Sequence, residues 1–158
     1  MEPAELTQWL NTYLNEMALS CAEHGGTLDK FMGDGIMGFF GDPQSKCEGE
    51  DALCCVRMCL AMTRRAGELE VPIRVGIASG ECTVGNFGSD AQMSYTIIGR
   101  QVNLAARLES NSEAGRVLIS ERTCELIAEE VNCLPRGPLS VKGIEQEINT
   151  FWVEGLKG

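Results

Sequence analysis

Glycine-centred turns divide this sequence into short apolar segments, and the spacing of the apolar residues changes from one segment to the next. Residues 6–22 repeat apolar side chains at helical intervals and stop at Gly25 and Gly26. Two strand-length runs, 27–31 and 36–40, then flank a Gly-Asp-Gly turn, where glycine can supply the positive φ of a tight hairpin. This alternation of helix and strand predicts an α+β sandwich with helices packed on a mostly antiparallel sheet.

The same patterns predict the remaining elements. We expect further helices at 48–62, 102–108 and 121–129, the last of them capped by Ser120. We expect further strands at 73–77, 82–84, 95–98, 117–119, 139–141 and 148–153. The strands 73–77 and 82–84 are expected to form a hairpin about Gly80 and Glu81. No repeat or linker interrupts the 158 residues, which predicts one domain over 1–158.

The charge of the chain restricts its partners. Its formal net charge of -10 argues against binding to nucleic acid or to anionic membrane, because both are polyanions that need a basic surface. No apolar run approaches the ~20 residues of a membrane span. The first residues also lack the basic and apolar regions of a secretory signal. We therefore expect a cytoplasmic segment without direct membrane contact, which a larger, membrane-attached signalling protein could contain.

The eight cysteines do not suggest a metal site. They form no CxxC pair, and His24 is the only histidine, so a zinc site has little support. In a reducing cytoplasm, free and mostly buried thiols are the expected state.

The turn in FMGDGIMGFF raises one carboxylate, Asp34, at the tip of the first hairpin. Taken alone, this pattern fits either ordinary turn chemistry or a ligand for a hard divalent ion. Three longer segments follow in order, LDKFMGDGIMGFFGDP, IRVGIASGECTVGNFG and SYTIIGRQVNLAARLES, with a late VKG. Together they closely resemble the class III adenylyl and guanylyl cyclase catalytic domains, and the resemblance covers essentially the whole chain. It implies a ferredoxin-like βαββαβ sandwich.

The resemblance assigns the reacting groups residue by residue. Asp34 matches the second of two aspartates that hold two Mg²⁺ or Mn²⁺ ions per site. Those ions would activate the ribose 3′-hydroxyl and neutralise the pyrophosphate leaving group. Asn103 and Arg107 match the pair that orients the ribose and stabilises charge on the α-phosphate. Their spacing of four residues would place them on one helical face.

The resemblance also implies the nucleotide contacts. Lys142 in SVKG and Arg74 in IRVGI match residues that bind the β- and γ-phosphates, Arg74 from the partner subunit. Lys30 matches the lysine that contacts adenine, at a position where guanylyl cyclases usually have glutamate. The second residue that contacts the base in this family matches Thr96. A threonine hydroxyl can accept a hydrogen bond from the adenine amino group. The Lys/Thr pair implies ATP as substrate, and threonine is typical of a bacterial bicarbonate-responsive subgroup, which suggests bicarbonate as a possible activator.

In this family the active site is shared between two chains, so the resemblance implies a homodimer. The strand that carries the first metal aspartate precedes the first helix in the family, and neither Asp29 nor Asp42 matches that position. We therefore expect the first strand to be missing and this polypeptide itself to be weakly active or inactive.

The leading interpretation is an adenylyl cyclase that makes 3′,5′-cyclic AMP and pyrophosphate from ATP for intracellular signalling. The alternative is a truncated or degenerate module of the same fold that binds nucleotide or dimerises without turnover. A guanylyl cyclase is disfavoured by Lys30. An RNA-binding domain is disfavoured by the acidic charge and by an aromatic content of 6%.

Overall fold

The computed structural model describes residues 2–32, 35–42, 47–89, 92–140 and 147–157, and leaves out the side chains of 31–32, 87–89 and 92–96. The helices in this part of the chain are α1 (Pro3–Glu23), α2 (Glu48–Glu68), α3 (Arg100–Asn111) and α4 (Glu121–Ile127). The strands there are β1 (Thr27–Met32), β2 (Gly35–Phe39), β3 (Arg74–Ile77), β4 (Thr83–Ser89), β5 (Gln92–Ile98), β6 (Arg116–Ser120), β7 (Val131–Leu139) and β8 (Ile148–Leu156). The predicted α+β class is confirmed.

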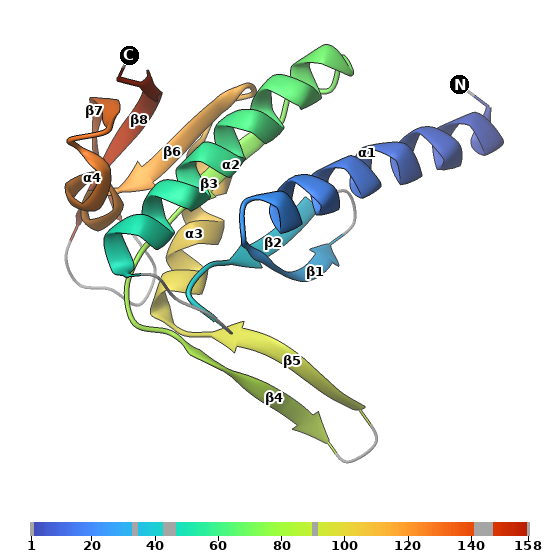
Figure 1. Ribbon diagram of the computed structural model, residues 1–158, viewed down its shortest axis with the longest axis horizontal. Helices are drawn as coiled ribbons and strands as arrows, with labels where there is room; N and C mark the ends of the chain where they lie inside the picture. Colours follow the sequence, from blue (N-terminus) through green and yellow to red (C-terminus); the bar gives the residue numbers. More distant parts are fainter. Residues whose placement is uncertain (1, 33–34, 43–46, 90–91, 141–146, 158) are drawn as a thin grey trace.

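The strands form one four-stranded sheet and two hairpins. The sheet has the order β3-β6-β8-β7, in which β3 and β6 are parallel and the other pairs are antiparallel. The pairs β1–β2 and β4–β5 form the two antiparallel hairpins. From α1 to β3 the elements follow the order α-β-β-α-β, which matches the last five elements of the expected βαββαβ order. Figure 1 shows the β4–β5 hairpin extending away from the sheet and its helices.

Strand β6, inside the four-stranded sheet, is buried on both faces. Val117 and Ile119 of β6 belong to the larger hydrophobic cluster, which includes residues of α1 and α2. Leu118, between them, points to the opposite face and joins a smaller cluster with Leu104 and Leu108 of α3. Successive side chains of a strand alternate between faces, so three consecutive apolar residues serve two cores. Burying each of these side chains stabilises the fold by about 1.5–3 kcal/mol.

Helix α1 is held against α2 by apolar packing and by one ion pair. Met17 of α1 and Val56 of α2 share the larger core. At the surface, the Arg65 guanidinium donates to both carboxylate oxygens of Glu16, with Nη2 2.8 Å from Oε1. This hydrogen bond holds the pKa of the Glu16 carboxyl below its ordinary value. No helix in the described ranges combines the length and the apolar character needed to cross a membrane.

Two local predictions were wrong. The strands β3 and β4 do not pair as a hairpin, because β3 pairs with β6 and β4 pairs with β5. Strand β7 begins at Val131, well before the predicted position 139. The two prolines in β7, Pro135 and Pro138, argue against a central strand, but β7 lies at the edge of the sheet, where proline is tolerated. The predicted cap is confirmed, since the Ser120 side chain accepts a hydrogen bond from the backbone N–H of Thr123.

Candidate functional site

Helix α3 presents Asn103 and Arg107 on its exposed side. Both side chains are exposed, whereas Leu104 and Leu108 on the same helix are 3% and 0% exposed. Residues four apart in a helix lie on one face, so the amide and the guanidinium are neighbours. Among the residues that the structure describes, no ion pair engages Arg107. The face therefore offers hydrogen-bond donors and the positive charge of Arg107, which suit an anion.

The position of α3 depends on one glycine of β3. A Cβ built on Gly76 would lie 2.3 Å from the backbone nitrogen of Glu109 and 2.5 Å from the backbone oxygen of Ala105. Only a residue without a side chain allows this approach, which places the backbone of α3 directly on β3. At its other end α3 begins after Gly99, whose φ of 146° favours glycine. The close approach at Gly76 thus sets the position of the second half of α3 relative to β3.

Strand β5 contacts both α3 and β1, the first strand of the first hairpin. It carries Thr96, whose backbone pairs with Gly85, although the threonine side chain is outside the described part. Lys30 lies on β1, next to a register shift between Leu28 and Lys30, which indicates a bulge at Asp29. The Lys30 ammonium is half exposed and lies 3.9 Å from the buried carboxylate of Asp29. Contacts of β5 thus link the strand that carries Lys30 to the helix that carries Asn103 and Arg107.

Arg74 lies against a different side of α3. Its guanidinium lies 3.3 Å from the carboxylate of Glu109, with both side chains about half exposed. Glu109 follows Arg107 by two residues, which rotates it by roughly 200° around the helix. Arg74 therefore does not join the face that carries Asn103 and Arg107. An exposed pair of this kind contributes about 0–1 kcal/mol, so it can be broken at little cost.

Two of the sequence-predicted residues, Asp34 and Lys142, lie outside the described residues. Asp34 falls between Met32 and Gly35, which pair with each other at the end of the β1–β2 hairpin. The described part of the chain contains no group of three or more His, Cys, Asp or Glu side chains that could hold a metal ion. The described residues therefore do not test the predicted metal ligand.

Sequence reasoning missed Glu109 and Gly76. No local pattern relates Glu109 to Arg74, because the two residues belong to elements that meet only in the fold. Gly76 did carry a signal, since a glycine inside an apolar strand often marks a close backbone approach.

The chain is similar to known proteins over nearly its whole length. Residues 1–155 match the family described as the adenylate and guanylate cyclase catalytic domain. The crystal structure of the adenylyl cyclase CyaB from P. aeruginosa superposes with a TM-score of 0.93 and 46% sequence identity, covering 97% of this chain and 84% of that one. The crystal structure of the guanylyl cyclase Cya2 gives 0.90 and 34%, covering 99% of this chain and 84% of that one.

Curated relatives extend the comparison. The adenylate cyclase of Anabaena cylindrica is 28% identical over 170 residues, which cover 98% of this chain and 33% of that protein. The chain spans about a quarter to a third of the length of the curated relatives that it matches.

Proposed function

Because this chain belongs to the adenylate and guanylate cyclase catalytic domain family, we propose that it converts ATP to 3′,5′-cyclic AMP and pyrophosphate. In this reaction the ribose 3′-oxygen bonds to the α-phosphorus, and the bond from that phosphorus to the pyrophosphate oxygen breaks. The hydroxyl proton is released, and no covalent bond to the protein forms. The exposed Asn103–Arg107 face of α3 is the observation that carries this proposal.

The two side chains of this face have separate proposed roles. Asn103 holds the ribose so that its 3′-hydroxyl points at the phosphorus, which removes much of the entropic cost of reaction. Arg107 donates to the α-phosphate oxygens, where negative charge increases in the transition state. A guanidinium suits this task because it presents several donors in a rigid plane and stays charged at all relevant pH values. The close packing of α3 on Gly76 supports these roles by fixing the helix.

Phosphate and metal binding complete the proposal. Lys142 and Arg74 are proposed to bind the β- and γ-phosphates, and Arg74 would have to exchange Glu109 for phosphate. Asp34 is proposed to hold Mg²⁺ or Mn²⁺, two ions per complete site. When bound, such ions supply Lewis-acid activation of the 3′-hydroxyl and charge neutralisation at the leaving group.

The proposed assembly is a twofold homodimer with the sites between subunits. The geometry supports this arrangement. Strand β5, which carries Thr96, contacts both the strand of Lys30 and the helix of Asn103 and Arg107, while Arg74 pairs with Glu109 on a different side of α3. One chain would therefore contribute the first set to one site and Arg74, with Asp34, to the other site.

The cellular setting is part of the same proposal. We place the domain in the cytoplasm, as the output of a longer signalling protein. Stimulation by bicarbonate is a hypothesis that rests on Thr96. Equal initial rates of cyclic AMP formation in bicarbonate and in chloride at fixed pH would contradict it.

Base selectivity tests the proposed substrate. The protein, prepared with any residues that its gene encodes upstream, should convert ATP in preference to GTP when both compete with Mn²⁺ present. Lys30→Glu should lower the ATP to GTP ratio of kcat/KM by about tenfold or more, because a carboxylate repels the acceptor nitrogens of adenine and favours guanine donors. Arg57→Glu, which makes the same charge change at an exposed position of α2, is the control and should leave the ratio unchanged. Binding of ATP without turnover would favour the non-catalytic module, and preferred turnover of GTP would overturn the proposed substrate.

A further inference from the structure

A buried hydroxyl at the start of α4 connects that helix to residues 78–82, the linking segment between β3 and β4. Thr123 is 0% exposed, and its Oγ1 lies 2.8 Å from Oγ of Ser79 and 3.0 Å from Oγ of Ser120. A threonine hydroxyl can donate one hydrogen bond and accept another, so it can bond to both serines at once. The bond to Ser120 is local to α4, whereas the bond to Ser79 joins two separate parts of the fold.

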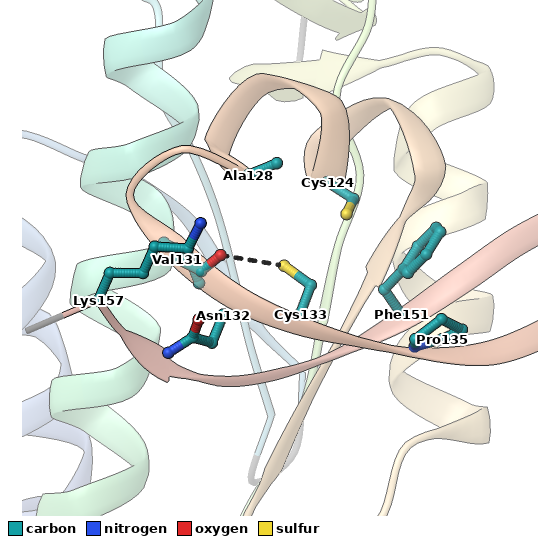
Figure 2. Close-up of a pocket in the computed structure, with 8 residues that line it drawn as sticks. All are labelled: Cys124, Ala128, Val131, Asn132, Cys133, Pro135, Phe151 and Lys157. Carbon is teal, nitrogen blue, oxygen red and sulfur yellow. Dashed lines mark hydrogen bonds between the residues drawn. The ribbon is translucent and has the colours of Figure 1, made fainter.

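Thr123 lies on the inner side of α4. Thr123 and Ile127 are both buried and four residues apart, so they share one face of the helix. Cys124 and Ala128 follow them by one residue each and line a surface pocket between α4 and β7 (Figure 2). Thr123 does not line this pocket. Its hydroxyl therefore makes its contacts inside the protein.

The linking segment packs against the start of α3. A Cβ built on Gly80 would lie 2.7 Å from Nε2 and 2.8 Å from Cγ of Gln101, so the backbone of Gly80 lies directly on that side chain. A Cβ built on Gly99, the N-cap of α3, would lie 3.4 Å from Cα of Cys82. The segment thus contacts both the cap and the first turn of the helix, two residues before Asn103.

The Ser79 hydroxyl fastens this segment. Within the part of the chain that the structure describes, none of the backbone hydrogen bonds of turns and loops involves residues 79–82. The bond from Ser79 to Thr123 therefore fixes one end of the segment, and its later residues touch α3. Gly76 sets the second half of α3, and the linking segment meets the first turn. Asn103 lies between these two supports.

We propose that Thr123 is a positioning residue for cyclic AMP formation and acts on Asn103 through Ser79 and the linking segment; this inference rests on the proposed function. Without the Thr123 hydroxyl, the linking segment loses its bond to α4, and the first turn of α3 loses a fixed neighbour. Asn103 then holds the ribose less well, and a small displacement of a positioning group lowers the rate strongly. The residues proposed to bind the phosphates lie elsewhere, so ATP binding changes little.

Removal of this hydroxyl tests the role. The protein is prepared with any residues that its gene encodes upstream, and kcat and KM for ATP are measured with Mn²⁺ at a temperature at which every variant is folded. Thr123→Val keeps the side-chain shape and should lower kcat about tenfold, with KM changed by less than about twofold. Thr123→Ser keeps the hydroxyl and should recover most of kcat. Ser79→Ala should reproduce the loss, and combining it with Thr123→Val should cause no further loss, because both break the same bond.

Thr150→Val is the matched control. Thr150 is as fully buried as Thr123, and its hydroxyl also forms a 2.8 Å hydrogen bond, which it donates to the backbone oxygen of Gly137. That bond joins β8 to β7 and does not involve the linking segment. Thr150→Val should therefore destabilise the fold and leave kcat unchanged. If Thr123 contributed only to stability, the two valine variants would behave alike.

Hydrogen–deuterium exchange tests the link to α3 without any turnover. In Thr123→Val, the backbone amides of residues 102–106 should exchange about fivefold faster than in the wild-type protein, and in Thr150→Val their exchange should be unchanged. Unchanged exchange in Thr123→Val overturns the proposal, and so does an unchanged kcat. A wild-type protein that makes no cyclic AMP would contradict the proposed function alone, because exchange still decides whether Thr123 holds the start of α3. If Thr123→Val does not fold, Ser79→Ala breaks the same bond from a partly buried position and decides the same outcomes.

Discussion

Replacing Arg107 with alanine, in the protein prepared with any residues that its gene encodes upstream, is expected to lower kcat for cyclic AMP formation by about 10² or more, with little change in ATP binding. The exposed guanidinium on α3 is proposed to neutralise charge that increases on the α-phosphate only in the transition state. Its loss should therefore raise the barrier without weakening the ground-state complex. Steady-state kinetics with Mn²⁺ and ATP, together with calorimetric titration of a non-hydrolysable ATP analogue, measure the two quantities separately.

Two variants control this result. Arg107→Lys keeps the charge but loses the planar donors, so it should recover only part of the rate. Arg57→Ala removes another exposed arginine, from α2, and should leave kcat unchanged. A variant Arg107→Ala that raised KM and kept its kcat would show that the guanidinium binds substrate and does not act in the transition state.

Replacing Gly76 with alanine is expected to destabilise the protein by about 3 kcal/mol or more and to abolish turnover. The added Cβ would lie 2.3 Å from the backbone nitrogen of Glu109, 2.5 Å from the backbone oxygen of Ala105 and 2.8 Å from the carbonyl carbon of Leu108. All three are backbone atoms of α3, so rotation of a side chain cannot relieve the overlap. The helix must move away from β3 and would take Asn103 and Arg107 with it. Urea unfolding followed by circular dichroism gives the change in free energy.

Gly67 offers a matched control for this substitution. It lies in the last turn of α2, and a Cβ added there would meet no heavy atom within 4 Å. Gly67→Ala should therefore be neutral or stabilising by up to ~1 kcal/mol, from helix propensity alone. A Gly76→Ala protein as stable and as active as Gly67→Ala would contradict the packing of α3 described above.

Local sequence patterns predicted most elements of the fold and fewer of its pairings. The hairpin of β1 and β2 was predictable, because its two strands and its glycine turn are adjacent in the chain. The pairing of β3 with β6 was not, because more than thirty residues separate the parallel strands and no local pattern encodes their contact. The length of β7 was also missed, because the tolerance of its prolines depends on its place at the sheet edge.

In the candidate site too, local relations between residues were predictable from the sequence, and contacts between distant elements were not. The spacing of Asn103 and Arg107 was sufficient to predict that they share one face of a helix, and the structure shows both residues exposed. The pairing of Arg74 with Glu109 was not predictable, because it depends on how β3 packs against α3. The resemblance to cyclases assigned Asp34 and Lys142, and these assignments stay predictions, since both residues lie outside the described part of the chain.

Mixing two inactive variants tests the central claim, that each active site takes Asp34 from one subunit and Arg107 from its mate. Asp34→Ala and Arg107→Ala are purified separately, mixed in equal amounts and allowed to exchange subunits, and cyclic AMP formation is measured. Random exchange gives half mixed dimers, and in each of these one site carries both substitutions while the other carries neither. The mixture should therefore recover about a quarter of the wild-type activity. Activity no higher than the average of the two separate variants, with mixed dimers demonstrated by native mass spectrometry, would contradict a site shared between subunits.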